Sequence, residues 1–314
     1  MTSNSLITIG TRKSLLAMWQ TETVADLLHG AGMTTRIAAM ETIGDRILDT
    51  SIAKIGSKGV FTAELEEQLA GGVTDIAVHS AKDMQSHLPE GFALIAFTER
   101  EKFTDVLLSD KVDIDLADPD RPLVIGTSSV RRRALLRHHY PHVEIVEMRG
   151  NLQTRIRKMQ EGACDALILA YAGVKRMGYQ AMIVKEFDPT VFVPPVGQGC
   201  IAIEAAVTLP AEKQAKIRAC LNHPESEMCL LAERAFLKKL EGGCSIPAFG
   251  CCVKQGDELS LTAGLASLDG RRILCVSQQG STDQPEALGE RVGEAILAQG
   301  GRTMLAEIRR QQTL

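Results

Sequence analysis

Apolar and polar positions alternate along the first hundred residues in a way that predicts short strands separated by helices. Leu6–Gly10 has the length and composition of a strand, and Ser14–His29 carries apolar residues at helical spacing. Thr35–Met40 and Asp75–His79 resemble further buried strands, with a helix expected over Phe61–Leu69 between them. This alternation is typical of a mostly parallel sheet with helices on both faces.

A second unit of the same kind is predicted from about Phe103. Ile9-Gly10-Thr11 in the first unit and Ile125-Gly126-Thr127 in the second each end a strand and precede hydroxyl residues that would begin a helix. Free N–H groups at the start of a helix favour anions, so both segments are candidate anion sites. The expected strands of the second unit are Leu123–Gly126, Val143–Met148 and Asp165–Leu169, and its expected helices are Val130–His138, Leu152–Gln160 and one ending at Arg176.

Residues 189–199 are too rich in Pro and Gly for a regular element and predict a crossing between the two units. Ile201–Ala206 is apolar again, which indicates a strand that rejoins the first sheet. A chain that leaves one α/β unit and later returns to it is typical of a two-lobed binding protein with its ligand between the lobes. From Pro224 the pattern changes to a helix over Glu227–Leu240, several strands and a terminal helix over Glu286–Ala298.

The predicted fold class is therefore α/β, with two hinged, doubly wound lobes like those of a two-lobed periplasmic binding protein. A small C-terminal α+β domain follows the lobes. The expected boundaries are 1–98 with 200–219 for the first lobe, 103–194 for the second, and 222–314 for the C-terminal domain.

Composition narrows the class of protein. The chain has 314 residues, of which 45% are hydrophobic and 24% charged, as in ordinary globular proteins. Its longest apolar stretch, near Ala166–Val174, is too short to cross a bilayer, and its N-terminus lacks the pattern of a signal peptide. We therefore expect a cytoplasmic protein with no membrane partner. The eight cysteines include no C-x-x-C pair and no histidine at metal-ligand spacing, so no metal is predicted.

Basic residues are concentrated in one part of the chain. Residues 121–176 contain eleven Lys and Arg against four Asp and Glu, although the formal net charge is −4. Several of these arginines, such as Arg131 and Arg149, lie where the chain changes direction, which suggests a cleft for several anionic groups. Carboxylates are favoured because a guanidinium binds them through two parallel hydrogen bonds. Solvated helix faces and nucleic-acid contacts are the alternatives, and the stretch has only two aromatic residues for stacking.

Two further residues have possible chemical roles. Cys244 lies in an irregular loop between Gly242-Gly243 and Pro247, where a buried, inert thiol and an accessible nucleophile or attachment point are both reasonable. Asp83 follows a predicted buried strand, either as a turn or helix cap or as a cleft carboxylate that stabilises positive charge. His79, at the end of that strand, is expected to be packed and not to act as a ligand.

Together these segments resemble the porphobilinogen deaminase, or hydroxymethylbilane synthase, family over essentially the whole chain. Each motif alone is weak, but eight in the same order and spacing are highly specific. The motifs are Gly10-Thr11-Arg12-x-Ser14, Lys54-x-Gly56-x-Lys58-Gly59, His79-Ser80-x-Lys82-Asp83, Gly126-Thr127-Ser128-Ser129-x-Arg131-Arg132, Arg149-Gly150-Asn151 with Arg155, Lys175-Arg176, Pro195-Val196-Gly197-Gln198-Gly199, and Glu241-Gly242-Gly243-Cys244.

The resemblance implies a transferase of tetrapyrrole (haem) biosynthesis that condenses four porphobilinogen molecules head to tail into hydroxymethylbilane and releases ammonia. The product grows on a dipyrromethane cofactor held by a thioether, and the motif gives this attachment to Cys244. Asp83 takes the place of the catalytic carboxylate, and Lys54 and Lys58 that of a loop covering the cleft. The implied cofactor- and substrate-binding residues are Arg12, Ser14, Ser80, Lys82, Thr127, Ser128, Ser129, Arg131, Arg132, Arg149, Gly150, Arg155, Gly173, Arg176 and Gln198.

The chain departs from the family pattern after Asp83. The family usually continues with Val-Pro, whereas here Met84-Gln85-Ser86-His87-Leu88 precedes Pro89, and Lys102-Phe103-Thr104 stands where the family often has an arginine. A non-catalytic two-lobed binding protein is one rival, but it would need neither Asp83 nor the cysteine loop. A nucleic-acid binder is disfavoured by the net negative charge and the few aromatic residues. We expect a monomer whose small-molecule partner is porphobilinogen.

Overall fold

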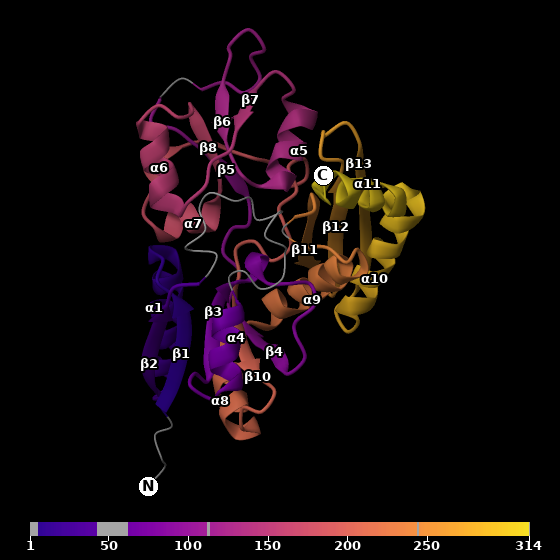
Figure 1. The fold of residues 1–314 in the computed structure, drawn as a ribbon. Coiled ribbons are helices and arrows are strands. Elements are labelled where there is room, and N and C mark those ends of the chain that lie inside the picture. Colours follow the sequence, from indigo (N-terminus) through magenta and orange to yellow (C-terminus); the bar gives the residue numbers. More distant parts are fainter. Residues whose placement is uncertain (1–5, 43–61, 112–113, 244, 314) are drawn as a thin grey trace.

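The structure is a computed structural model that describes residues 6–42, 62–111, 114–243 and 245–313. Within these ranges the strands form two five-stranded sheets and one three-stranded sheet. Figure 1 shows one lobe around each five-stranded sheet, with a C-terminal unit around the third. The predicted α/β class with an additional α+β unit is therefore confirmed.

The first lobe combines the start of the chain with a segment that returns to it. Its elements are β1 (Leu6–Arg12), α1 (Leu15–Gly30), β2 (Thr34–Met40), α4 (Ala63–Ala70), β3 (Ile76–Ser80), β4 (Phe92–Phe97), β10 (Ile201–Ala206) and α8 (Ala211–Leu221). The strand order is β2-β1-β3-β10-β4, with β10 antiparallel to both of its neighbours. A core between the sheet, α1 and α8 includes Ile9, Val24 and Ile217, and α4 packs Leu65 onto the other face.

The second lobe repeats this arrangement. Its elements are β5 (Asp105–Leu108), β6 (Val124–Gly126), α5 (Val130–His139), β7 (Glu144–Val146), α6 (Leu152–Gln160), β8 (Ala166–Ala170), α7 (Tyr171–Arg176) and β9 (Ile183–Glu186). The strand order β7-β6-β8-β5-β9 again has parallel strands on one side and an antiparallel strand in fourth place. In each lobe that fourth strand, β10 or β5, follows directly on a segment that crosses from the other lobe (Figure 1).

Two segments, 98–104 and 187–200, connect the lobes and lie side by side. The backbone N–H of Glu101 donates to the carbonyl of Gly199 at 3.2 Å. A Cβ on Gly199 would lie 2.2 Å from the carbonyl oxygen of Glu101, and its φ is +93°, so only glycine allows this approach. The predicted irregular crossing at 189–199 is confirmed.

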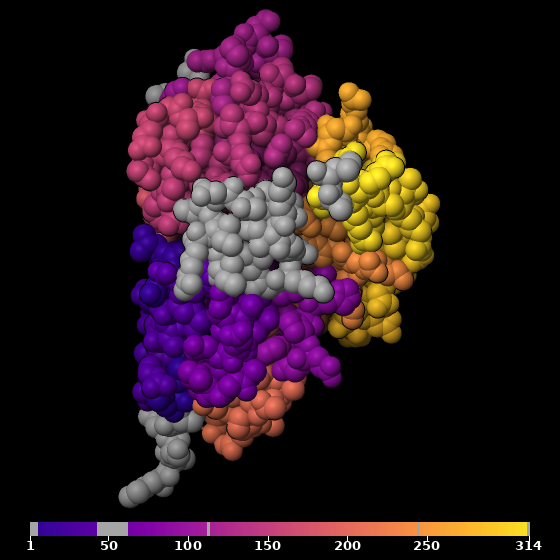
Figure 2. All heavy atoms as spheres, in the orientation of Figure 1, coloured from indigo at the N-terminus to yellow at the C-terminus, as the bar shows by residue number. Residues whose placement is uncertain are grey.

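The C-terminal unit contacts both lobes (Figure 2). Its elements are α9 (Pro224–Lys239), β11 (Ala248–Gln255), β12 (Glu258–Ala266), β13 (Ile273–Ser281), α10 (Pro285–Ile296) and α11 (Arg302–Thr313). Phe249 and Ala266 of its sheet belong to a core of the second lobe, whereas Leu230 of α9 packs with Phe97 and Ala202 of the first. The unit therefore supports the positions of both lobes.

Several elements differ from the sequence-based expectation. The patterns did not predict β4, β5, β9, α8 or α11. The predicted terminal helix, Glu286–Ala298, corresponds to α10, and α11 follows it. They are separated by a π-turn, η3 (Leu297–Gly301), in which Gly300 has a φ of +105°. No helix in the described ranges combines the length and apolar character needed to cross a membrane. The predicted site residues Lys54, Lys58 and Cys244 lie outside the described residues.

Candidate active site

An open cleft lies at the carboxyl ends of β1 and β3. Ser14 follows β1 and caps α1 by accepting a hydrogen bond from the N–H of Ala17 at 3.4 Å. Ser80 ends β3, and the exposed Asp83 ends the short 3₁₀ helix η1 (Ala81–Asp83) that follows. The cleft is lined by Arg12, Ser14, Leu16, Ala17, Gln20, Thr62, Val78, His79, Ser80 and Asp83. The structure thus brings together four residues that the sequence predicted from separate motifs.

Gln20 belongs to the same cleft, although the sequence did not single it out. It is buried on α1, and its Nε2 donates to Ser80 Oγ at 2.9 Å. Because this amide fixes the serine hydroxyl, Gln20 orients one predicted binding residue. A glutamine within a helical pattern resembles an ordinary surface residue, so no local signal could have identified it.

The connection between β6 and α5, like that between β1 and α1, ends in a serine that caps the following helix. Ser129 caps α5 by accepting from the N–H of Arg132 at 3.4 Å, and Thr127 Oγ1 accepts from the N–H of Ser129 at 3.3 Å. Both Ile-Gly-Thr segments therefore lead into a serine-capped helix, as predicted. Ser128 Oγ is buried and has no hydrogen-bond partner among the described residues, so it is available to a ligand.

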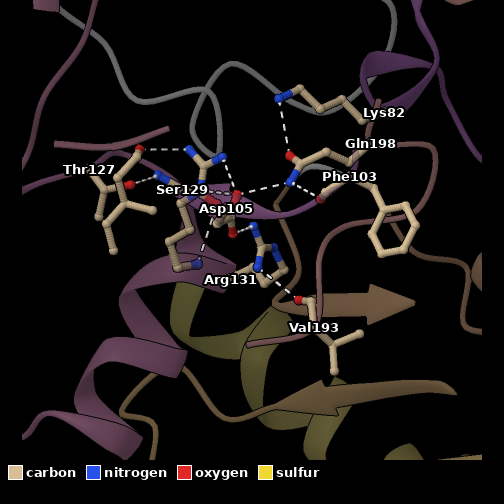
Figure 3. Close-up of polar contacts among 10 residues, drawn as sticks. Lys82, Phe103, Asp105, Thr127, Ser129, Arg131, Val193 and Gln198 are labelled. Atoms are coloured by element: carbon tan, nitrogen blue, oxygen red, sulfur yellow. Dashed lines mark hydrogen bonds and ion pairs between the residues drawn. The ribbon is translucent and has the colours of Figure 1, made fainter. Parts of the chain in front are cut away.

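The two arginines of this turn are buried and paired with Asp105, the first residue of β5. Arg131 Nη2 lies 2.5 Å from Asp105 Oδ2, and Arg132 Nη2 lies 2.7 Å from Oδ1 (Figure 3). Burial alone would raise the pKa of Asp105, but the two guanidinium charges outweigh it and hold the pKa well below its usual range. Arg131 and Arg132 also donate to the carbonyl oxygens of Val193 and Ile168, respectively.

Gln198 extends this network into the crossing and on to the first lobe. Its Nε2 donates to Asp105 Oδ1 at 3.0 Å, and its Oε1 accepts from Lys82 Nζ at 3.4 Å (Figure 3). Burial, reinforced by the charge of Arg132, lowers the pKa of Lys82 to about 8, and Asp83 and Asp105 oppose this change. Lys82 therefore loses its proton at an unusually low pH for a lysine.

Charged residues of both lobes affect the pKa of Arg155. Its Nε donates to the carbonyl oxygen of Gly150 at 2.8 Å. Burial lowers the pKa of Arg155 to about 10, as do the charges of Arg132 and Arg149, whereas Asp83 opposes the shift. Asp83 of the first lobe and Arg155 of the second therefore lie within electrostatic range of each other.

Backbone conformation matters at Gly150, which follows Arg149 in the loop before α6. Its φ is +113°, and a Cβ there would lie 2.8 Å from Thr154 Cγ2. Only glycine fits this loop without strain. Arg149 lies 3.9 Å from Glu147 and is mostly buried.

Arg176 and Gly173, on α7, lie where the lobes meet. Arg176 Nη2 donates to the carbonyl of Gly199 at 2.8 Å, and its guanidinium lies 5.5 Å from the centre of the Trp19 ring. A Cβ on Gly173 would approach Leu16 to 3.7 Å, which is ordinary contact. These two predicted site residues therefore border the junction between the lobes.

Asp105 is the main residue that the sequence analysis missed. The sequence motifs indicated Arg131 and Arg132 as groups facing a ligand, but both already bind Asp105. Of their guanidinium nitrogens, only Arg131 Nε is buried without a partner among the described residues. Their role toward a ligand stays a prediction. His79 is packed as expected, with Nε2 lying 2.9 Å from Glu204 Oε2. The described residues contain no cluster of three or more potential metal ligands.

Comparison with known proteins gives consistent matches. The family model described as "Porphobilinogen deaminase, dipyromethane cofactor binding domain" matches residues 7–213, and "Porphobilinogen deaminase, C-terminal domain" matches residues 227–298. Porphobilinogen deaminase of Desulfosudis oleivorans is 60% identical over 98% of this chain and 99% of its own length. That of Cytophaga hutchinsonii is 52% identical over 98% of each chain. Among solved structures, the periplasmic VFT2 domain of Bordetella pertussis BvgS (Double Mutant F375E/Q461E) covers 69% of this chain and 85% of its own, with a TM-score of 0.42 and 14% identity.

Proposed function

The chain belongs to the porphobilinogen deaminase family, and from this premise we propose that it condenses porphobilinogen into hydroxymethylbilane in the cleft beside Asp83. One observation carries the proposal. Asp83 and the predicted binding residues Arg12, Ser14 and Ser80 line the same open cleft, although two separate segments of the chain supply them. Arg155 of the second lobe lies within electrostatic range of Asp83.

Asp83 has the properties that the reaction requires of a catalytic carboxylate. Loss of ammonia from porphobilinogen leaves positive charge on the pyrrole, and a fixed anion beside the ring stabilises that charge as it develops. The same carboxylate can accept the pyrrole N–H and assist proton transfer at the departing amine. Asp83 is exposed to the cleft, so a ring can reach it.

The cationic residues around Asp83 suit a ligand with many carboxylates. Each pyrrole ring contributes an acetate and a propionate, and guanidinium and ammonium groups bind such groups through charge-assisted hydrogen bonds. We assign this binding to side chains from both lobes and to two backbone positions. They are Arg12, Ser14, Ser80, Lys82, Thr127, Ser128, Ser129, Arg131, Arg132, Arg149, Gly150, Arg155, Gly173, Arg176 and Gln198.

The residues of the second lobe fit the dipyrromethane cofactor of the family. Ser128 Oγ and Arg131 Nε are buried without partners among the described residues, and both can donate to a carboxylate. When bound, dipyrromethane supplies the primer to which substrate units are added. We assign its thioether to Cys244 and the covering loop to Lys54 and Lys58, three residues that the structure does not describe.

We further propose a cytoplasmic monomer that does not bind nucleic acid. The formal net charge of −4 and the small number of aromatic residues support the last point. The seven described cysteines are all free, as is usual in a reducing compartment. The division into 1–98 with 200–219, 103–194 and 222–314 remains our proposal for the domains, supported by the three separate sheets.

Intact mass of the purified protein, compared with Cys244→Ala, is the first test. We expect the parent to exceed its chain mass by two linked pyrrole units and the variant to match its chain mass. The parent should also release ammonia and form hydroxymethylbilane from porphobilinogen. A parent that stays at the bare chain mass after incubation with porphobilinogen, and forms no product, would favour the non-catalytic binding protein.

A further inference from the structure

Gln85 occupies a distinctive position directly beyond the catalytic turn. It lies two residues after Asp83, where the family pattern usually has proline, which has no side-chain donor. Its Nε2 donates to Thr62 Oγ1 at 3.3 Å, and its carbonyl oxygen accepts from Arg234 Nη2 at 2.9 Å. Thr62 immediately precedes α4, and Arg234 belongs to α9. One residue therefore connects the Asp83 turn to α4 and to the C-terminal unit.

The contact with Thr62 has a defined direction. Thr62 is buried, and its hydroxyl also hydrogen-bonds to the carboxyl of Glu66, one turn along α4. A hydroxyl has a single proton to donate. Since the amide of Gln85 supplies a proton to Thr62, the hydroxyl is free to direct its own proton to Glu66. A side chain at position 85 that cannot donate would break this chain of hydrogen bonds.

The turn that carries Asp83 is supported from two sides by described segments of the chain. On one side the crossing packs against the turn so closely that a Cβ on Gly197 would lie 2.8 Å from the carbonyl carbon of Ala81. On the other side, Met84 is buried and Gln85 makes the contacts described above.

We propose that Gln85 is a positioning residue, which holds the turn carrying Asp83 at a fixed place relative to α4 and α9. This inference rests on the proposed function of Asp83. A carboxylate stabilises developing charge most strongly when it lies at the correct position. Small displacements of the carboxylate weaken this stabilisation. In this chain, a side-chain amide supplies rigidity at a position where the family usually has a proline ring.

Two substitutions at position 85 test the proposal. Gln85→Met keeps the length of the side chain and removes its polarity, and Gln85→Glu keeps its shape but removes the N–H donor at neutral pH. We expect each to lower kcat about three- to ten-fold, the usual effect of losing one hydrogen bond, with KM for porphobilinogen changed less than about two-fold. Thr62→Val should give a similar loss, and combining it with Gln85→Met should add little.

Ser86→Ala is the matched control, because the hydroxyl of Ser86 contacts Nδ1 of the neighbouring His87 at 3.4 Å. Deuterium exchange of the holoenzyme gives a second readout. Gln85→Met should speed exchange in both 62–70 and 81–88, and the control should do so in neither. An active parent whose kcat and exchange survive both Gln85 substitutions would overturn this inference alone. A parent that does not convert porphobilinogen would overturn the proposed function, while the exchange data would still report the contact.

Discussion

The two Ile-Gly-Thr segments both lead into a serine-capped helix, but the arginines near them lie in different surroundings. In the first lobe, the turn leads to Arg12 and Ser14, which line an open cleft opposite Asp83. In the second lobe, the equivalent turn leads to Arg131 and Arg132, which are buried and bound to one aspartate. A local motif therefore specifies a helix start and its serine cap, but a residue from elsewhere in the chain decides whether the nearby cations reach a ligand.

Because the arginines are buried in one lobe and beside an open cleft in the other, the two lobes contribute different features to the site. A buried aspartate held by two guanidinium groups forms a rigid support, because moving any member would leave a charge desolvated and unpaired. The open turn, by contrast, keeps a cation and a carboxylate beside space that a substrate can enter. We infer that the second lobe supplies a fixed positive surface and the first lobe supplies the reacting carboxylate.

Removing the negative charge of Asp105, the counter-ion of Arg131 and Arg132, should have the largest effect on the difference between the lobes. Asp105→Asn leaves two buried guanidinium groups without a negative partner, and we expect it to reduce the free energy of unfolding by about 3–5 kcal/mol. Urea unfolding of the variant and of Asp110→Asn, an exposed aspartate five residues away, would measure this. A loss below about 1 kcal/mol for Asp105→Asn would mean that the pairing adds little to the second lobe.

Asp83→Asn should affect turnover and leave the fold intact. Since the carboxylate is exposed, we expect the unfolding free energy to change by less than about 0.5 kcal/mol. Loss of the anion should lower kcat roughly 100-fold or more, while the mass of the bound cofactor stays the same. Ammonia release by the variant, beside the exposed control Glu90→Gln, is the measurement. Turnover near the parental rate would remove Asp83 from the mechanism.

Replacing one arginine in each lobe would test whether Arg12 acts in binding and Arg131 in stability. Arg12→Gln should raise KM for porphobilinogen roughly ten-fold, as expected for a lost charge-assisted hydrogen bond, with a smaller effect on stability. Arg131→Gln should lower stability more, because it breaks a buried ion pair with Asp105. Steady-state kinetics and urea unfolding of both variants would show whether the two effects separate. Equal loss of stability in both would contradict the proposed division.

Hydrophobic spacing could predict those elements whose pattern is local. Leu152–Gln160 and Ile201–Ala206 match α6 and β10 at both ends. The four residues of β5 are all buried, so they show no alternation, and α8 buries only Ile217 and Leu221, which is too few for a clear helical stripe.

The site could be predicted only as far as its motifs extend. Asp83 was placed correctly after a buried strand, and the motif residues Arg12, Ser14 and Ser80 do share its cleft. Asp105 could not be predicted, because its partners Arg131 and Arg132 lie 26 and 27 positions later in the chain and only the strand order brings them together. Contacts between distant segments depend on tertiary structure, which periodicity does not encode.

Lys82 of the first lobe is linked through Gln198 to Asp105 of the second. Its titration therefore tests whether the two lobes are electrostatically coupled. Its pKa, lowered by burial to about 8, is below the ordinary value of 10.5. Between those two pH values the unfolded chain holds a proton that the folded chain has lost, so the contribution of Lys82 to stability rises with pH there. Below about pH 8 the folded protein bears the whole cost of burying the charged amine.

A substrate carboxylate should have the opposite effect on Lys82, because it favours the ammonium form and draws a proton back onto the amine. Binding should therefore weaken as the pH rises through about 8, with KM for porphobilinogen increasing a few-fold between pH 7 and 9. Lys82→Arg stays charged over this range and should show no such rise beyond that of the substrate itself. The ratio of the two KM values against pH isolates Lys82, since titration of the substrate cancels. If KM depends on pH in the same way for the parent and for Lys82→Arg, the amine of Lys82 does not change charge over this range. The lobes would then not be coupled through Lys82.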